Sequence, residues 1–260
     1  GHINCHEAAS IENTGHKILE LPGVDGKLSA QKIEACASEY FNDGEPEHLT
    51  VPKMVYISFP TELGTLYSLE ELKEIRQVCD KYGMYLFVDG ARMGYGLGSE
   101  ANDVSLRDFG QLADVFYLGG TKCGALFGEA VILLADSLKH RFKTYMKQNG
   151  AVLAKGWLLG LQFYALLENG EYFKITARAD KLAMHLKEAF TEKGISFAVD
   201  SPTNQQFVIL TPLQEKKLAE KYIFEGMGTL EDGRKKVRFC TSWSTTEEEI
   251  EALIADIQAL

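Results

Sequence analysis

The residues best suited to chemistry are an aspartate and a lysine, each of which follows a short apolar stretch. Leu86-Phe87-Val88 precedes Asp89, and Phe116-Tyr117-Leu118 leads through two glycines and Thr121 to Lys122. This pattern predicts two buried strands whose C-terminal ends present these side chains at one pocket. A carboxylate and an amine so placed suit pyridoxal 5'-phosphate (PLP). The acid keeps the pyridine nitrogen protonated, and the amine holds the aldehyde as a Schiff base.

Both residues also have an ordinary interpretation. Lys122 alone could be a surface lysine, and Asp89 alone could cap the turn that follows its strand. Glycines at positions 119, 120, 124 and 128 favour the functional interpretation, because they leave room for a bulky ligand near the backbone. Lys122 would then also act as a base or proton carrier once an amino acid is bound.

Three further residues are candidates for binding roles. Arg92 either pairs with a surface acid or binds a substrate carboxylate through its planar fork of donors. Arg238 lies between Val237 and Phe239 on an expected strand, so it faces either solvent or a pocket. His2 is either an exposed residue or an imidazole stacked on the cofactor ring.

The first half of the chain predicts strands that alternate with helices. Strands are expected at 17–21, 54–58, 84–88, 114–118 and 130–134, and residues 1–5 are interpreted as the end of another strand. Helices are expected at 7–13, at 29–40 after Ser29, and at 69–83, where Ser68 and Glu71 form a capping box. This alternation implies a mainly parallel sheet with helices on both faces, which binds ligands beyond the C-terminal ends of its strands.

The second half has a different pattern. Helices are expected between 137 and 167, with breaks near Gly150 and Gly156, and over 172–193. Short strands follow at 195–199, 207–210 and 237–240, and a last helix opens with a capping box over 245–248. We therefore predict an α/β fold with a large domain over residues 1–145 and a smaller α+β domain over residues 146–260.

Composition excludes several classes of partner. The chain has 27 basic and 37 acidic residues and no basic block, so a nucleic acid is not expected. Its longest apolar run, at 130–135, is far shorter than the roughly 20 residues of a membrane helix. Five scattered cysteines without a CxxC motif predict reduced thiols and a cytoplasmic location. No metal-ligand spacing is present, so no metal is expected.

Short motifs occur along nearly the whole chain in the same order as in one known family. They are Gly1–Ala8, Thr14–Lys17, Leu21–Leu28, Thr61–Thr65, Val88–Arg92, Gly120–Lys122 and Ser201–Asn204. In these motifs the chain resembles the threonine aldolase / β-eliminating lyase family of fold-type-I PLP enzymes, which have the aspartate aminotransferase fold. The resemblance implies a PLP cofactor, an amino-acid substrate, and homodimers or homotetramers with shared active sites.

The resemblance also implies a role for each candidate. Lys122 matches the Schiff-base lysine, Asp89 the partner of the pyridinium, and His2 the histidine that stacks on the cofactor ring. Arg92 and Arg238 match the two arginines that hold the substrate carboxylate. Thr121 and the segment 147–155 are implied to contact the cofactor, the latter at its phosphate.

The chain departs from the family pattern in two ways. Family members carry several dozen residues before the point where this chain starts, with a glycine-rich loop and helix N-terminus that grip the phosphate. The large domain is therefore expected to be incomplete at its N-terminus. Threonine aldolases also commonly have a histidine after the strand expected at 54–58, where this chain has Thr61 and Glu62. Glu62 is a candidate base beside the substrate side chain.

The favoured activity is cleavage of a β-hydroxy-α-amino acid, such as threonine or allo-threonine, to glycine and an aldehyde. Two alternatives remain at this stage. The same residues permit β-elimination or racemisation, which begin with loss of the α-proton. A non-catalytic protein that keeps the fold is the other alternative.

Overall fold

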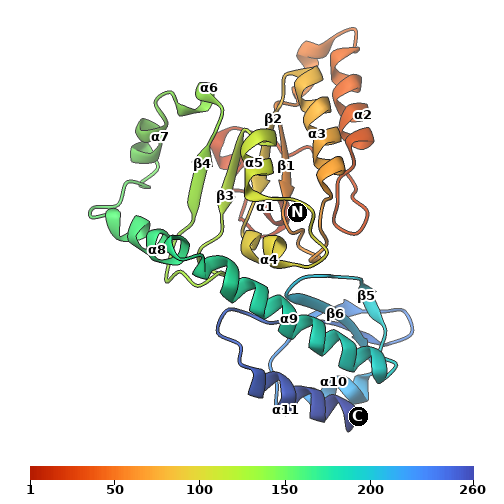
Figure 1. The fold of residues 1–260 in the computed structure, drawn as a ribbon. Coiled ribbons are helices and arrows are strands. Elements are labelled where there is room, and N and C mark those ends of the chain that lie inside the picture. The colour runs from red at the N-terminus through yellow and green to blue at the C-terminus, as the bar shows by residue number, and fades with distance from the viewer.

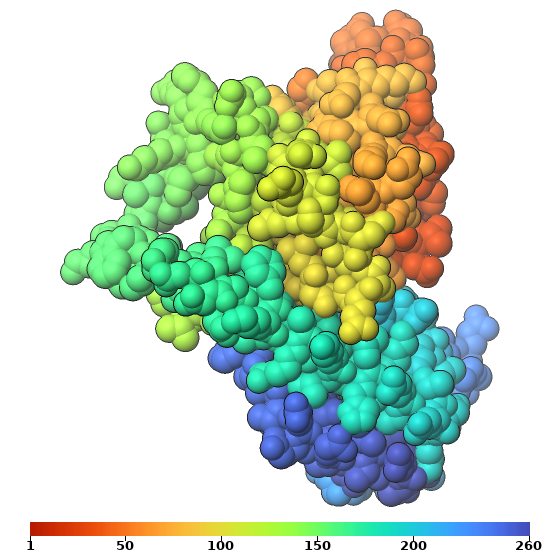
Figure 2. Space-filling view, viewed as in Figure 1, coloured from red at the N-terminus to blue at the C-terminus, as the bar shows by residue number.

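The computed structural model describes residues 1–260 as two lobes joined along one long helix (Figure 1). Each lobe is built on its own four-stranded sheet. In the space-filling view the long helix crosses the molecule between the lobe of the first half and the lobe of the second (Figure 2). The structure is an α/β fold, as the sequence predicts.

The sheet of the first lobe has the order β1-β2-β3-β4. Its strands are β1 (Met54–Ser58), β2 (Tyr85–Asp89), β3 (Val115–Leu118) and β4 (Ala130–Leu133). The first three are parallel, which confirms the prediction, whereas β4 runs antiparallel to β3. Only a loop joins β3 to β4, and without a crossover helix the chain returns in the opposite direction.

Two of the four helices between residues 30 and 112 begin at the caps that the sequence predicts. The four are α2 (Ala30–Phe41), α3 (Leu69–Tyr82), α4 (Met93–Gly98) and α5 (Leu106–Leu112). The Ser29 hydroxyl accepts from the N–H of Lys32 at the start of α2. The capping box of Ser68 and Glu71 is present, and α3 ends at Gly83 in the left-handed conformation. The sequence analysis missed α4 and α5, which are short.

The N-terminal region differs most from expectation. Residues 2–5 form the short helix α1 (His2–Cys5) rather than the end of a strand. The helix expected at 7–13 is replaced by turns and the 3₁₀ helix η1 (Glu12–Thr14), and a second 3₁₀ helix, η2 (Pro46–His48), follows α2. The strand expected at 17–21 is extended chain without a pairing partner. An apolar run becomes a strand only where a neighbouring strand pairs with it, which the local sequence does not encode.

The second half contains the remaining helices and a second sheet. The helices are α6 (Asp136–Lys139), α7 (Phe142–Gln148), α8 (Trp157–Glu168), α9 (Glu171–Glu192), α10 (Pro212–Ala219) and α11 (Glu247–Gln258). The strands are β5 (Phe197–Val199), β6 (Gln205–Leu210), β7 (Glu225–Thr229) and β8 (Lys235–Cys240), in the antiparallel order β5-β6-β8-β7. The last capping box is one residue later than predicted, between Thr246 and Glu249.

Two hydrophobic cores meet on α9. One buried cluster extends from Ala30 to Ala179 and includes the inner face of the first sheet. The other begins at Leu182 on the same helix and packs under the second sheet and α11. Three helices, α6, α7 and α8, lie between the two sheets in the chain, and the domain boundary predicted near residue 145 falls among them. This boundary remains a proposal.

The lobes also meet at a polar seam beside the first sheet. The hydroxyl of Thr203 donates to the carbonyl oxygen of Gly64 at 2.9 Å, and the Ser99 hydroxyl donates to the carbonyl oxygen of Pro202 at 2.7 Å. Thr203, Ser99 and Ser201 are buried. The seam places the segment before β6 against the loop that follows β1 and against the end of α4. None of the helices combines the length and apolar character needed to cross a membrane.

Candidate active site

The polar residues at the C-terminal edge of the first sheet come from three adjacent strands. Ser58, the last residue of β1, is in register with Asp89, the last residue of β2. Lys122 lies four positions beyond the end of β3, which pairs with β2. Because these strands are parallel, their ends lie at one edge, as the sequence predicts.

Asp89 is 7% exposed and is held by three neutral donors. The hydroxyl of Tyr56 donates to its Oδ2 at 2.7 Å, and the backbone N–H of Ala91 donates to its Oδ1 at 2.9 Å. The hydroxyl of Tyr117 also donates to Oδ1. No cation forms an ion pair with this carboxylate. Asp89 is therefore a buried acid whose charge is solvated by hydrogen bonds but not neutralised.

The glycines around Asp89 and Lys122 serve chain packing. A Cβ on Gly90 would lie 1.9 Å from the carbonyl oxygen of Tyr117, and one on Gly119 would lie 2.4 Å from the carbonyl oxygen of Ala91. On Gly124 a Cβ would meet the side chain of Ile175 at 2.7 Å. The expectation that the glycines leave room for a ligand is thus wrong at Gly119 and Gly124, where the protein itself fills the space. Gly90 and Gly119 let the ends of β2 and β3 approach each other.

Lys122 occupies a loop that Glu129 organises. The Glu129 carboxylate accepts from the hydroxyl of Thr121 at 2.6 Å and from the backbone N–H of Gly120. Lys122 itself makes no side-chain hydrogen bond or ion pair. Partial burial lowers the pKa of its amine, and the guanidinium of Arg92 lowers this pKa further. An amine with a lowered pKa is more often neutral near physiological pH, which is the nucleophilic form.

Arg92 is a half-buried cation without an acidic partner. The arginines that form ion pairs are Arg76, Arg234 and Arg238, and Arg92 is not among them. Burial lowers the pKa of Arg92, and the nearby guanidinium of Arg238 lowers it further. The surface ion pair considered as the ordinary interpretation is absent. An uncompensated guanidinium in this environment favours an anionic ligand.

Arg238 reaches the site from the second lobe. Its Nη1 donates to the Oε1 of Gln205 at 3.1 Å, and its Nη2 pairs with the carboxylate of Glu225, its cross-strand neighbour. Its side chain is 20% exposed, and its Nε is buried without a partner. Val237 and Phe239 point into the second core, so Arg238 faces the other way, toward the lobe junction.

His2 and Glu62 lie together at the end of β1. The backbone N–H of His2 donates to the Oε1 of Glu62 at 2.9 Å, and the Ser58 hydroxyl donates to the same oxygen at 3.0 Å. Burial alone would raise the pKa of Glu62, but these hydrogen bonds outweigh it and hold the pKa below its usual range. The imidazole of His2 is 46% exposed and its Nδ1 lies 2.5 Å from a carboxylate oxygen of Glu7.

Sequence reasoning missed four residues of this site. Tyr56 and Tyr117 were interpreted only as strand residues. Glu129, in a loop after a glycine, and Gln205, at the start of a strand, were given no role. A signal existed for the tyrosines, since in register with β2 they fall on the same face of the sheet as Asp89. That register depends on strand pairing, which the sequence alone does not give.

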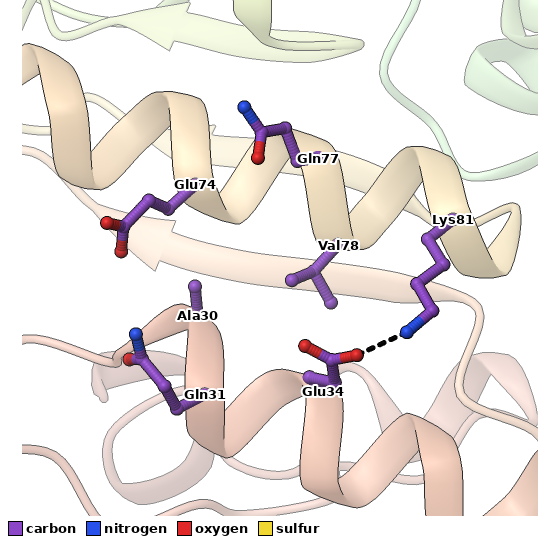
Figure 3. A pocket seen from close by; sticks show the side chains of 7 residues that line it. All are labelled: Ala30, Gln31, Glu34, Glu74, Gln77, Val78 and Lys81. Atoms are coloured by element: carbon purple, nitrogen blue, oxygen red, sulfur yellow. Dashed lines mark hydrogen bonds and ion pairs between the residues drawn. The ribbon is translucent and has the colours of Figure 1, made fainter.

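A separate surface groove lies between α2 and α3 (Figure 3). It is lined by Ala30, Gln31, Glu34, Glu74, Gln77, Val78 and Lys81. Its Glu34 and Lys81 neutralise each other in an ion pair. It combines no nucleophile with a base, so it offers no chemistry comparable to that of the strand ends.

Comparison with known proteins shows the family of the chain. Residues 1–212 match the beta-eliminating lyase family. The chain is 29% identical to a low specificity L-threonine aldolase of a Pseudomonas species (strain NCIMB 10558), over 100% of this chain and 74% of the relative. It is 28% identical to a protein of the same description from Pseudomonas aeruginosa, over 99% and 73%.

Solved structures agree as well. The structure of Leishmania major threonine aldolase superimposes with a TM-score of 0.96 at 42% identity, covering 100% of this chain and 75% of that one. Mouse CSAD, at 14% identity, gives a TM-score of 0.72 and shares the fold alone. The α/β fold and the match to threonine aldolase place the protein among the lyases of the fold-type-I class. The chain belongs to the beta-eliminating lyase family.

Proposed function

We propose that this protein is a PLP-dependent lyase that cleaves a β-hydroxy-α-amino acid of the threonine type to glycine and an aldehyde. The names of its relatives support the reaction, and the site supports the cofactor. One observation carries the proposal. The strand ends hold a buried carboxylate without a cation, Asp89, and a half-buried guanidinium without an anion, Arg92.

These two unbalanced charges match an amino acid bound to PLP. A pyridinium nitrogen would supply the cation that Asp89 lacks, and an α-carboxylate would supply the anion that Arg92 lacks. Both charges act on Lys122, since Arg92 lowers the pKa of its amine and Asp89 raises it. The residues present thus fit the cofactor at its ring and aldehyde. Contact of the phosphate with the segment 147–155 remains a prediction.

When bound, PLP withdraws electrons from the α-carbon of an amino acid so that a bond to that carbon can break. The protein's own residues decide which bond. Arg92 and Arg238, on different lobes, anchor the carboxylate and so fix the rotation about the α-carbon. Gln205 holds Arg238 in place and also donates to the carbonyl oxygen of Glu62 at 3.5 Å. Substrate orientation is therefore tied to the junction of the lobes.

Glu62 is the base that we assign to the β-hydroxyl. Its carboxylate is held ionised by donors from His2 and Ser58, and an ionised carboxylate accepts a proton. It lies after β1, where the sequence analysis expects contact with the substrate side chain. His2 packs beside it, and we assign its ring the stacking role on the cofactor. Thr121 fixes the Lys122 loop through Glu129 and lies next to the cofactor.

A second copy of the chain is a further part of the proposal. The helix α8 exposes Trp157, Leu161 and Tyr164, each at least half exposed, and only Phe163 of this helix is buried. A helix that is apolar on several sides and still exposed favours association. We propose a homodimer or homotetramer that covers α8. A sedimentation mass equal to one chain would contradict it.

The test uses the purified protein, PLP and L-threonine or L-allo-threonine. We expect the absorbance band of lysine-bound cofactor, followed by release of glycine and acetaldehyde. Both should be lost in Lys122→Ala and kept in Lys139→Ala, whose amine is exposed and paired with Asp136. Release of pyruvate and ammonia from serine instead would indicate β-elimination. Absence of the band in the unmodified protein would contradict the proposal.

A further inference from the structure

The residues that hold Asp89 form an aromatic row on one face of the first sheet. Tyr56 and Phe87 are in register, and their rings stack with centroids 4.8 Å apart. The ring of Phe87 meets that of Tyr117 edge-on, with centroids 6.2 Å apart. Because side chains alternate along a strand, Asp89 lies on the same face as Phe87, two residues before it. The row therefore places two phenol hydroxyls beside one carboxylate.

The hydroxyls of Tyr56 and Tyr117 act as donors in their hydrogen bonds to Asp89. Burial raises the pKa of Tyr56 and of Tyr117, and the charge of Asp89 and its hydrogen bonds raise both further. The hydroxyls therefore stay protonated, and the carboxylate is the acceptor in each bond. This is the arrangement expected around an aspartate that must remain an anion in a buried position.

The hydrogen bonds that Asp89 accepts show which of its acceptor positions is still free. An ionised carboxylate accepts about four hydrogen bonds, two at each oxygen. Oδ1 of Asp89 accepts from Tyr117 and from the N–H of Ala91, whereas Oδ2 accepts only from Tyr56. One position remains, and it is on Oδ2. A single open position on a rigid carboxylate defines the direction from which a further donor must approach.

We infer that Tyr56 and Tyr117 are positioning residues that hold Asp89 as an anion and direct its open Oδ2 position at the ring nitrogen of the cofactor. The inference rests on the proposed function and adds to it a pair of residues outside the family motifs. Their effect on the reaction passes through Asp89, whose orientation decides how firmly the pyridine nitrogen keeps its proton.

The test compares Tyr56→Phe, Tyr117→Phe and the double variant with Tyr85→Phe. Tyr85 is on β2, the strand of Asp89, but its hydroxyl bonds Ser137 at 2.9 Å and not Asp89. We expect the Kd for PLP to rise about tenfold in each single variant and further in the double variant. The pH at which the band of lysine-bound cofactor changes should shift in these variants and not in Tyr85→Phe. Values equal to those of Tyr85→Phe would overturn the inference.

A second measurement needs no cofactor. A double-mutant cycle of Tyr117→Phe with Asp89→Asn, read by urea unfolding, should be strongly non-additive, whereas Tyr85→Phe with Asp89→Asn should be additive. Additivity in both cycles overturns the inference. If the unmodified protein forms no band with PLP, the proposed function fails, and the cycle still decides whether the tyrosines hold Asp89.

Discussion

At the scale of single residues, the site is defined by charges that the chain does not balance. Arg76 and Asp114, both half-buried, pair at 2.7 Å, and the half-buried Lys27 pairs with Glu71 in the same way. Asp89 and Arg92 at the strand ends have no such partner. Folding does not require unpaired buried ions, which lower stability, so they are retained for a ligand that carries the opposite charges.

Replacement of Arg92 by glutamine tests this argument. We expect the KM for the amino acid to rise between about tenfold and a hundredfold, because a charge-assisted contact to the carboxylate is worth about 1.5–3 kcal/mol. The Kd for PLP should change little, since PLP itself lacks the carboxylate. The matched control is Arg234→Gln, whose guanidinium pairs with Asp232 at the surface. An unchanged KM would show that Arg92 does not bind the substrate.

At the scale of elements, the sequence predicted those features whose cause is local. Ser68, Glu71 and Gly83 mark the ends of α3 because caps act within a few residues, and the apolar runs of β1 and β2 form strands with alternately buried side chains. The direction of β4 was not predicted, and residues 1–5 were predicted as the end of a strand rather than as α1, since pairing and packing with distant segments decide both. Sequence motifs predicted Asp89 and Lys122 as site residues. They did not predict Tyr117, because its position beside Asp89 depends on the register between β2 and β3.

Gly90, between Asp89 and Ala91, allows the ends of β2 and β3 to lie close together at the site. In Gly90→Ala the new Cβ would lie 1.9 Å from the carbonyl oxygen of Tyr117, so β2 and β3 must separate at their ends. We expect a loss of about 2 kcal/mol or more in the free energy of unfolding, measured in urea, and a loss of cofactor binding. Gly110→Ala in α5 is the control, because its Cβ meets nothing within 4 Å and should stabilise the helix slightly. Equal stability of the two variants would refute this explanation.

At the scale of the whole molecule, α9 joins the lobes, and Asp180 is buried at that point of the helix. It follows Ala179, the last member of the first core, and is itself 4% exposed. Neither of its carboxyl oxygens has a hydrogen-bond partner, and burial raises its pKa to about 9. The carboxyl is therefore neutral in the folded protein at neutral pH, which lets it lie between two apolar cores.

This raised pKa makes overall stability depend on pH in a direction unusual for an aspartate. Between about pH 4 and pH 9 the folded state binds a proton at Asp180 that the unfolded state has released, so this residue lowers the free energy of unfolding as pH rises through that window.

Asp180→Asn, which resembles the protonated carboxyl in shape, should remove this contribution. We expect the variant to be more stable than the unmodified protein at pH 8, with a smaller difference at pH 5, in urea unfolding at each pH. Asp256→Asn is the control, because its carboxylate is exposed and paired with Lys221. A constant difference between Asp180→Asn and the unmodified protein across this range would mean that Asp180 is ionised in the fold, and that the lobes meet around a charge rather than a neutral carboxyl.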